Sequence, residues 1–523
     1  MHPRALTASF AEGEGPAWQA LAQHRKNPVH TATLFHQELS EDGARGALRV
    51  ASRAHFNVGF VERKQMAQPQ IALSAIAKLR SKFAGSALQP GDKDYDNVRA
   101  LHNGLIDKHP ALIARCRNDA DIAASIEFAR EHRLEIAVRG GGHNVSGRAS
   151  VEGGMMIDLS LMKAISVNAA TRRAVAQGGV TWGEFNRETQ QHGLATTGGV
   201  ISSTGIAGLT LGGGYGYLAG KHGLAVDNLV AATLVTADGE TVRASDSENP
   251  DLYWALRGGG GNFGVVSSFE YSLHTVGPTI MAGVIAWPIS QAREVLRFYR
   301  EFTNSAPDEL ACLAGVGHAP DGSGVKVAII AAAYCGPMTD GERMLRPIKE
   351  FGSPLFDMIQ PTEYSTLNTM FDAAYPKGML YYWKSNFLST LDDNLINTMI
   401  EAVEHCPSKY SGITLEHWHG AAARVSQDQT AFVYRREGYN LLLLSQWHDP
   451  AANRENIAWA REGSASLEPF FASARYVNYL DQDDAADVMG AFGGNYARLA
   501  QVKAKWDRGN VFHLNQNIQP AND

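Results

Sequence analysis

Three consecutive glycines between an arginine and a histidine are the first residues of this sequence that could do chemistry. The run Arg139-Gly140-Gly141-Gly142-His143-Asn144 directly follows residues 134–138, whose alternating apolar side chains predict a strand. Glycines at the end of a strand let backbone N–H groups approach an anion closely, and Arg139 would add positive charge. A mere tight turn needs fewer glycines. We therefore interpret the run as a phosphate-binding loop with His143 at its mouth.

A second glycine-rich segment, residues 198–216, reads Gly-Gly-Val-Ile-Ser-Ser-Thr-Gly-Ile-Ala-Gly-Leu-Thr-Leu-Gly-Gly-Gly-Tyr-Gly. It contains too many glycines for a helix or a central strand. Such a backbone suits a chain that wraps around a flat ligand.

A third glycine pattern, Gly259-x-Gly261-x-x-Gly264, has the spacing of the dinucleotide-binding fingerprint. That fingerprint needs a strand before it and a helix after it, because the helix N-terminus holds the pyrophosphate. Here residues 251–256 predict a helix before the pattern, and residues 265–273 predict a strand after it. We therefore reject a nicotinamide-dinucleotide site at this loop.

The elements around these loops predict alternating helices and strands. Asn118 is placed to cap a helix whose apolar residues lie on one face, and further strands are predicted at residues 155–159 and 171–180. Asp238-Gly239 joins two strand-like runs and predicts a hairpin. From residue 278 to about 473, strands such as 325–334 and 439–447 alternate with helices such as 392–405, which indicates a second domain built as a sheet backed by helices.

Composition narrows the class of protein. The chain has 523 residues, with 47 basic and 54 acidic side chains and a net charge of −7, and no basic tract stands out. These numbers argue against a nucleic-acid partner. The N-terminus lacks the apolar core of a signal peptide, and the most apolar stretch, residues 325–335, contains Lys326 and is too short to span a bilayer. We expect a cytoplasmic protein with no membrane partner.

Metal binding is not expected. The four cysteines lie far apart without a Cys-x-x-Cys pair, which disfavours a zinc site or a disulfide framework. His417 and His419 have the spacing of a metal pair on a strand, but the sequence offers no third ligand beside them. We interpret them as residues of a strand face.

Taken together, these segments resemble the vanillyl-alcohol oxidase / p-cresol methylhydroxylase (PCMH) superfamily, in its berberine-bridge-enzyme-like branch. That branch includes bacterial hydroxynicotine and sugar oxidases. The resemblance runs from about residue 105 to 520 and rests on the motifs at residues 139–147, 205–216, 223–228, 254–265, 476–479 and 510–517.

The resemblance implies an α+β fold in several parts. It predicts a two-part FAD-binding domain of the PCMH type at residues 105–277. A substrate domain with an antiparallel sheet backed by helices would follow at 278–473. Residues 474–523 would form a C-terminal segment that returns to the FAD domain, and residues 1–72 are an extension with no assigned role.

The resemblance also implies the cofactor and its contacts. FAD would be bonded covalently to His143 alone, because Ile201 stands where many members have a second, cysteinyl bond. A single bond makes bulky polymeric substrates less expected. The residues implied to hold the cofactor are Arg139, Gly140, Gly141, Gly142, His143, Asn144, Ser146, Gly147, Thr204, Gly205, Gly208, Val265, Asn515 and Asn517.

Two tyrosines match the family's catalytic positions. Tyr479 ends the motif Tyr476-Val477-Asn478-Tyr479 and would be the catalytic base, assisted by Tyr215. A phenol with a reference pKa near 10 needs a hydrogen-bond donor or a cation to become a base at neutral pH. We expect Tyr215 to supply the donor and Lys384 or Arg435 the cation. Leu442 and Leu209 replace polar residues that relatives often carry, so a less polar pocket is expected.

The implied function is an FAD-dependent oxidase. It would transfer hydride from a small alcohol, sugar-like or secondary-metabolite substrate to FAD, with molecular oxygen as acceptor and hydrogen peroxide as product. Thr204 stands where similar oxidases have a small residue that admits oxygen. The alternatives are amine oxidation of the hydroxynicotine type, or a flavin-holding binding protein without turnover.

Overall fold

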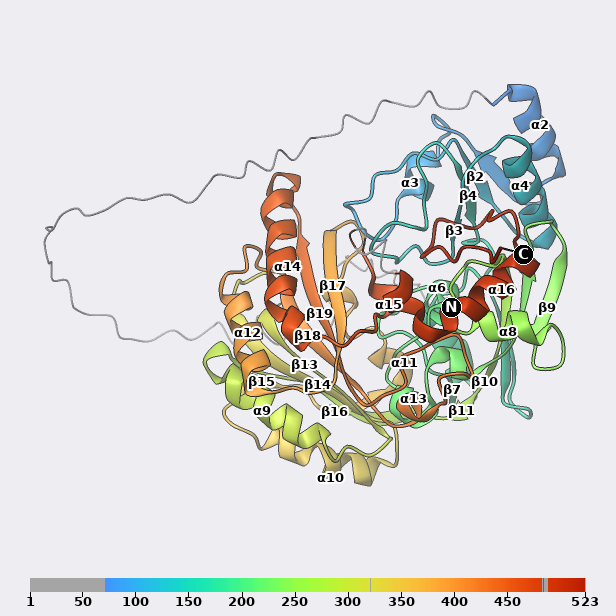
Figure 1. Ribbon diagram of the computed structural model, residues 1–523. Coiled ribbons are helices and arrows are strands. Elements are labelled where there is room, and N and C mark those ends of the chain that lie inside the picture. The colour runs from blue at the N-terminus through green and yellow to red at the C-terminus, as the bar shows by residue number, and fades with distance from the viewer. Residues whose placement is uncertain (1–70, 320, 482, 484–487, 523) are drawn as a thin grey trace, which may run out of the picture. The chain divides into compact units, whose positions relative to one another are not determined.

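The computed structural model describes residues 71–319, 321–481, 483 and 488–522 (Figure 1). All of these residues belong to one compact unit that begins at Ile71. The expected N-terminal extension, residues 1–72, lies outside the described residues except for its last two.

A four-stranded sheet opens the described chain, in the order β1-β2-β4-β3. Its strands are β1 (Ser86–Leu88), β2 (Leu112–Arg115), β3 (Ile136–Arg139) and β4 (Met155–Asp158), and the helices beside them are α2 (Leu73–Lys82), α3 (Tyr95–Arg99) and α4 (Asp119–Glu131). Strands β2 and β3 run parallel to β4, whereas β1 is antiparallel to β2. Helix α4 begins where the sequence predicts, because the Asn118 side chain accepts a hydrogen bond from the Asp121 N–H. The sheet includes β1, so it starts before the expected boundary at residue 105.

A five-stranded antiparallel sheet follows, in the order β5-β6-β10-β8-β9. Its strands are β5 (Ile165–Asn168), β6 (Arg173–Gln177), β8 (Leu229–Val235), β9 (Thr241–Ser245) and β10 (Val265–Ser272). The elements between them are α5 (Trp182–Gln190), β7 (Leu194–Ala195), α6 (Ile206–Leu211), α7 (Ala219–His222), α8 (Pro250–Leu256) and β11 (His274–Thr275). The predicted hairpin joins β8 to β9, and Gly239 at its turn has φ +82°, which favours glycine.

One prediction for the second glycine segment is wrong. Residues 206–211 form the short helix α6, although the segment was expected to be non-helical. Within α6 only Gly208 is a glycine, and Ile206, Ala207 and Leu211 are buried. Since one helical glycine costs about 1 kcal/mol relative to alanine, burial of these apolar side chains outweighs the low helix propensity.

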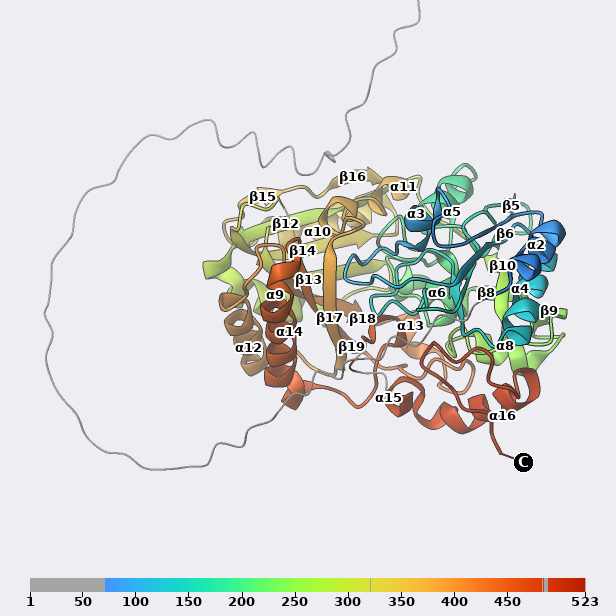
Figure 2. The same ribbon diagram turned by 90° about the horizontal axis from the view of Figure 1, so that it is seen from above.

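An antiparallel sheet of eight strands forms the second part of the unit, in the order β15-β12-β14-β13-β18-β19-β17, with β16 paired to β12. Its strands are β12 (Thr279–Pro288), β13 (Leu310–His318), β14 (Lys326–Tyr334), β15 (Phe356–Asp357), β16 (Gln360–Glu363), β17 (Leu380–Leu388), β18 (Gly412–Trp418) and β19 (Gly438–Trp447). Helices α9 (Ala292–Thr303), α10 (Met338–Lys349), α12 (Asp393–Glu404) and α14 (Asn453–Leu467) pack on one face of it, and α11 (Tyr364–Leu367) and α13 (Ala421–Arg424) lie in the connections. The other face turns toward the first part of the molecule (Figure 2). The α+β fold with an antiparallel sheet backed by helices is therefore confirmed.

The C-terminal segment packs against the first part of the molecule. Helices α15 (Val488–Phe492) and α16 (Tyr496–Trp506) contribute Phe492, Leu499 and Val502 to the core that contains α8. Lys503 is fully buried, forms an ion pair with Asp507 at 2.6 Å and donates to the carbonyl oxygens of Asn262 and Phe512. This fully satisfied ammonium fixes the tail beside the third glycine loop.

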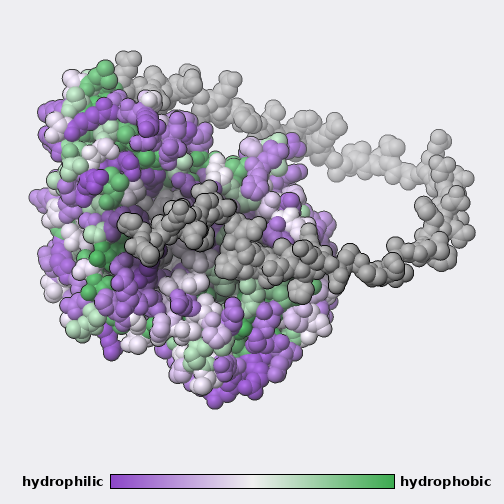
Figure 3. Space-filling view, turned by 180° about the vertical axis from the view of Figure 1, so that it is seen from behind, coloured by the Kyte–Doolittle hydropathy of each residue, from purple (hydrophilic) through white to green (hydrophobic). Residues whose placement is uncertain are grey.

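The surface shows no concentration of apolar side chains on the face drawn in Figure 3, where hydrophobic residues are scattered among hydrophilic ones. Within the described ranges, no helix combines the length and apolar character needed to cross a membrane.

Candidate active site

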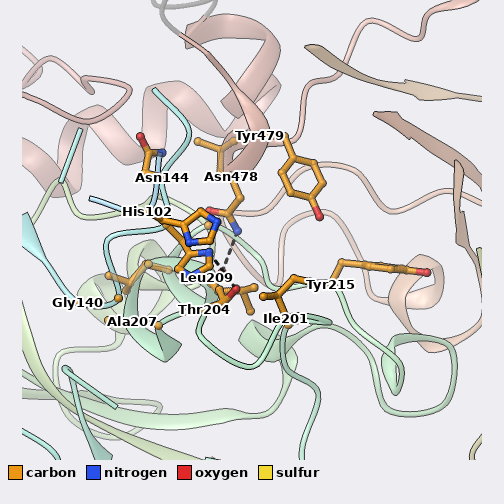
Figure 4. A pocket seen from close by; sticks show the side chains of 18 of the residues that line it. His102, Gly140, Asn144, Ile201, Thr204, Ala207, Leu209, Tyr215, Asn478 and Tyr479 are labelled. Atoms are coloured by element: carbon orange, nitrogen blue, oxygen red, sulfur yellow. Dashed lines mark hydrogen bonds between the residues drawn. The ribbon is translucent and has the colours of Figure 1, made fainter. Parts of the chain in front are cut away.

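A cavity of about 310 Å³ lies between the glycine loops and the inner face of the eight-stranded sheet. Figure 4 shows His102, Gly140 and Asn144 toward one end, with Tyr215 and Tyr479 toward the other. All three glycine segments of the sequence contribute to the wall. The predicted site residues on the wall are Gly140, Gly141, Gly142, His143, Asn144, Thr204, Gly205, Gly208, Tyr215, Tyr479 and Asn515.

The first two glycine loops touch each other through their backbones. A Cβ atom added to Gly141 would lie 2.3 Å from the Gly205 nitrogen, and one added to Gly205 would lie 2.3 Å from the Gly141 nitrogen. No side chain fits at either position. The two loops therefore form a narrow cradle on the cavity wall at which only backbone fits, as expected for close approach of a bound flat ligand with a phosphate group.

The third glycine loop also lines this cavity, which the sequence did not indicate. Helix α8 precedes it and strand β10 follows it, so the reason for rejecting a dinucleotide fingerprint holds. Residues 259–262 and Gly264 nevertheless form part of the wall. Asn515 donates a hydrogen bond to the Gly261 carbonyl at 2.9 Å, so the C-terminal segment holds the loop in place.

Arg139 does not carry out its predicted role in this geometry. Its side chain is buried outside the cavity wall, forms an ion pair with Asp158 at 2.8 Å and donates to the Val98 carbonyl. The buried Asp158 carboxylate neutralises the guanidinium and draws it away from the loop. The arginine on the wall is Arg148, which sequence reasoning missed.

Four other predicted cofactor contacts also lie outside the wall, namely Ser146, Gly147, Val265 and Asn517. Ser146 instead shapes the first loop, because its hydroxyl donates to the Asn144 side chain at 2.8 Å. Gly147 donates its N–H to the Asn144 carbonyl at 3.0 Å. These two residues stabilise the loop through hydrogen bonds to Asn144 and do not line the cavity.

His143 sits in a small polar cluster beside Thr204. Its Nε2 lies 2.9 Å from the Ser203 hydroxyl, and its Nδ1 lies 3.4 Å from the Thr204 hydroxyl. The ring stacks on His102 with 3.9 Å between centroids. Burial lowers the pKa of His143 to about 3, so the imidazole is neutral and keeps a nucleophilic nitrogen at physiological pH. His102 was not predicted, because nothing in its local sequence links it to this loop.

Tyr479 is hydrogen-bonded to a buried carboxylate that the sequence did not reveal. Its hydroxyl donates to Glu416 Oε1 at 2.9 Å, and Asn440 Nδ2 donates to Glu416 Oε2 at 2.8 Å. Burial raises the pKa of Glu416 to about 7. Burial and the charge of Glu416 hold the pKa of Tyr479 well above its ordinary value of 10. Glu416, the acidic residue of strand β18, is therefore the group of this pair that loses its proton near neutral pH, while Tyr479 stays protonated.

The three residues expected to assist Tyr479 have other hydrogen-bond or ion-pair partners. The Tyr215 hydroxyl donates to the His417 carbonyl at 3.1 Å, although the Tyr215 ring does line the cavity. Lys384 pairs with Asp481 at 3.0 Å, and Arg435 pairs with Asp227 at 2.7 Å. These carboxylates compete for the cations, so neither cation is positioned to stabilise a phenolate at residue 479.

The wall opposite the glycine loops is mainly apolar. It presents Leu313, Ile329, Leu442 and Leu444 from the central strands of the large sheet. Leu442 and Leu209 are on the wall, so the replacements noted in the sequence do reduce its polarity. His417 and His419 are not on the wall. They stack on each other at 4.1 Å, and the described residues contain no cluster of three potential metal ligands.

The arrangement fits FAD. The cradle between Gly141 and Gly205 admits only backbone, the wall carries one arginine for an anion, and a neutral histidine stands at the loop. These features suit a diphosphate joined to a flat ring system. The class that the fold and site define is an FAD-linked oxidoreductase.

Comparisons with known proteins agree with this class. The FAD binding domain family matches residues 110–245, and the "berberine and berberine like" family matches residues 475–519. The chain is 30% identical over 453 residues to (R)-6-hydroxynicotine oxidase of Paenarthrobacter nicotinovorans, covering 83% of this chain and 97% of that protein. The chain therefore belongs to the berberine-bridge-enzyme-like family of FAD-linked oxidoreductases.

Solved structures show the same fold. The crystal structure of 6-hydroxy-D-nicotine oxidase from Arthrobacter nicotinovorans matches with a TM-score of 0.77 at 30% identity, covering 84% of this chain and 98% of that one. Glucooligosaccharide oxidase from Acremonium strictum matches with a TM-score of 0.77 at 25% identity, covering 86% and 100%. The latter enzyme carries a 6-S-cysteinyl, 8α-N1-histidyl FAD.

Proposed function

We propose that this protein is an oxidase that moves hydride from a small substrate to FAD bonded covalently to His143. When bound, FAD supplies the two-electron acceptor, and molecular oxygen then takes the electrons to give hydrogen peroxide. The observation that carries the proposal is the hydrogen-bonded pair Tyr479–Glu416, which lines the same cavity as the glycine cradle. A proton acceptor and a hydride acceptor would thus face one substrate.

The proton has a defined route in this pair. As hydride leaves the substrate carbon, the proton of the adjacent hydroxyl passes to the Tyr479 oxygen, while the Tyr479 proton passes to Glu416 Oε1. The substrate alcohol becomes a carbonyl, and the enzyme gains one proton on Glu416. This route needs no free phenolate, which matters because the pKa of Tyr479 is raised while that of Glu416 is about 7.

The covalent bond to FAD would be single. His143 is neutral and stands at the loop, whereas the wall position expected for a second, cysteinyl bond is Ile201. None of the four cysteines, Cys116, Cys312, Cys335 and Cys406, is on the cavity wall.

The substrate proposed on this basis is a small secondary alcohol, sugar-like ring or other secondary metabolite. The apolar strand wall favours the less hydroxylated members of this set, since each buried hydroxyl group needs a hydrogen-bond partner.

Amine oxidation is the second candidate, and a specific observation favours it. No cationic side chain lies within ion-pairing distance of Glu416 in the described ranges, and aromatic rings surround its partner Tyr479. Trp383, also on the wall, meets the Tyr479 ring edge to face at 6.2 Å. A carboxylate beside aromatic faces attracts an organic ammonium ion, and Glu416 would accept its proton before hydride transfer. The similarity to a hydroxynicotine oxidase also supports this candidate.

One experiment separates these functions. Alcohols, sugars and cyclic amines are mixed with the holoenzyme under anaerobic conditions, and bleaching of the flavin absorbance is followed. Bleaching by alcohols or sugars supports the first candidate, and bleaching by amines alone supports the second. A protein whose flavin is bleached by dithionite but by no substrate class would instead fit a flavin-holding binding protein.

A further inference from the structure

Arg148 projects from the end of the first glycine loop onto the cavity wall. Among the described residues, the cavity wall offers one cationic side chain, Arg148, and one carboxyl side chain, Glu416. Glu416 belongs to the strand wall beside Tyr479, whereas Arg148 belongs to the loop that was expected to bind phosphate.

The contacts of Arg148 tie two distant segments together. Its Nε donates to the Ser146 hydroxyl at 3.2 Å, within the same loop. Its Nη1 donates to the carbonyl oxygens of Leu514 and Asn515, both at 2.9 Å. Its Nη2 has no protein partner among the described residues. The guanidinium is thus held in place on one side and leaves donors for a ligand on the other.

The charge of Arg148 is not neutralised by the protein around it. No carboxylate of the described residues forms an ion pair with it, and burial lowers its pKa. Asp481 acts on it only from a distance, since Asp481 pairs with Lys384 at 3.0 Å. Arg139, in the same loop, differs because Asp158 pairs with it. A partly buried cation without a counter-ion is costly, so this position calls for a bound anion.

We infer that Arg148 binds the diphosphate of FAD and, through the same guanidinium, holds the C-terminal segment against the loaded cofactor site. A planar guanidinium with two free donor directions suits phosphate oxygens, because it makes charge-assisted hydrogen bonds. Binding of the diphosphate fixes the side chain, and the fixed side chain holds Leu514 and Asn515. Loading of FAD and closure of the tail are therefore coupled. The inference depends on FAD binding and not on the proposed oxidase reaction.

The test compares two flavins that differ in the diphosphate. Reversible binding of FAD and riboflavin is measured by fluorescence titration in the His143→Ala variant, with Arg148, Arg148→Lys or Arg148→Met. If the wild-type chain itself releases its flavin on denaturation, the covalent proposal fails and the same titration uses the wild-type background. Charge-assisted hydrogen bonds contribute about 1.5–3 kcal/mol, so Arg148→Met should weaken FAD binding roughly 10–100-fold. Riboflavin binding should stay unchanged, and Arg148→Lys should fall between.

Lys108 supplies the matched control. Its ammonium donates to the carbonyl oxygens of Gly147 and Ser150 at 2.8 and 3.1 Å, yet it is not on the cavity wall. Lys108→Met removes a cation that supports the same loop, and it should not discriminate between FAD and riboflavin.

The tail gives an independent readout. In the protein that keeps Arg148, FAD should protect the backbone amides of residues 510–519 from hydrogen exchange. In the Arg148→Met variant, FAD should no longer protect them. An equal loss of FAD and riboflavin affinity would show that Arg148 acts only as a structural tie and would overturn the inference. Unchanged FAD affinity would overturn it too. If Arg148→Met does not fold, Arg148→Lys still decides, because a phosphate contact predicts a loss for FAD alone.

Discussion

At the scale of single residues, burial sets the protonation of the side chains in the candidate site. His143 is kept neutral by burial, and Tyr479 is kept protonated by burial and by Glu416. We therefore propose the Glu416 carboxylate as the final proton acceptor, because its pKa of about 7 is close to the pH at which a base works best. Substitutions of His143, Tyr479 and Glu416 test the roles proposed for these three residues.

Substitution of His143 by alanine should release the flavin. Wild-type protein denatured on a gel should keep flavin fluorescence, whereas His143→Ala should lose it to the supernatant after acid precipitation, since it lacks the bonding nitrogen. Ser203→Ala, which removes only a hydrogen-bond partner of His143 at 2.9 Å, serves as the control and should keep some covalent flavin. Free flavin released from the wild-type protein would disprove the covalent bond.

Tyr479→Phe should slow flavin reduction by roughly 10²–10⁴-fold, the usual contribution of a positioned proton-transfer group. The phenyl ring keeps its packing against Tyr476 and Trp383, so flavin content and thermal stability should change little. Tyr215→Phe is the control and should have a small effect, because its hydroxyl bonds to the His417 carbonyl. Anaerobic stopped-flow measures both rates. A wild-type rate in Tyr479→Phe would favour direct amine oxidation.

Glu416→Gln should flatten the pH dependence of flavin reduction. The wild-type rate should rise as pH passes through about 7, where Glu416 ionises, and the variant should be slow at all pH values. The free energy of unfolding should change in the opposite direction to the rate as pH rises. The folded-state pKa is raised above the ordinary 4.5, so the stability contributed by protonated Glu416 is full below pH 4.5 and is lost as pH rises through about 7. The variant should therefore gain melting temperature relative to wild type at pH 8 but not at pH 4.5. An unchanged pH profile would rule out Glu416 as the acceptor.

At the scale of elements, loops and strands from different parts of the chain meet at the cavity. The first and second glycine loops cross at Gly141 and Gly205, and Asn515 holds the third loop. Strands β13, β14 and β17 to β19 provide the opposite wall. Each loop is flanked by a helix or strand that fixes its ends. The glycines allow the backbones of the first two loops to lie close together.

Gly205→Ala should separate the crossing loops. Its Cβ would lie 2.3 Å from the Gly141 nitrogen, so the backbone must shift, and overpacking of this kind costs about 1–3 kcal/mol. The melting temperature and the flavin content should both fall. Gly494→Ala is a matched control, because its Cβ meets nothing within 4 Å. A Gly205→Ala protein with wild-type stability and full flavin content would contradict the crossing seen here.

At the scale of the whole molecule, the three larger sheets and the returning tail of the described residues contribute to the surroundings of one cavity. The mainly apolar sheet faces the glycine loops across this space, and the C-terminal segment packs onto the loop side through Lys503 and Asn515. The Thr204 hydroxyl lies 3.4 Å from His143 Nδ1 on the wall of this cavity.

The reduced holoenzyme should react rapidly with oxygen. Stopped-flow mixing of reduced protein with aerated buffer should show fast return of flavin absorbance and formation of hydrogen peroxide. Thr204→Leu, with a bulkier side chain, should slow reoxidation more than reduction by substrate. Slow reoxidation of the wild type, with fast turnover only on artificial acceptors, would identify a dehydrogenase.

Local pattern in the sequence determined much of this protein. Helix α4, the hairpin of β8 and β9, the loop after β3 and the motif ending at Tyr479 depend on capping, periodicity and turn residues that lie within a few positions of each other. The resemblance of these motifs also led to the family and to FAD. Short helix α6 escaped prediction, because its stability comes from burial rather than from propensity.

Only the tertiary structure decided which charged and polar side chains share the cavity. The sequence pointed to Arg139 as the anion-binding arginine, but Asp158 pairs with Arg139, and Arg148 is the arginine on the wall. Glu416 meets Tyr479 because β18 turns its carboxylate inward, and His102 meets His143 because the chain returns to the loop. Such encounters depend on strand register and long-range packing. Burial of Glu416, Tyr479 and His143 then shifts their pKa values, and the spacing of residues in the sequence does not predict that burial.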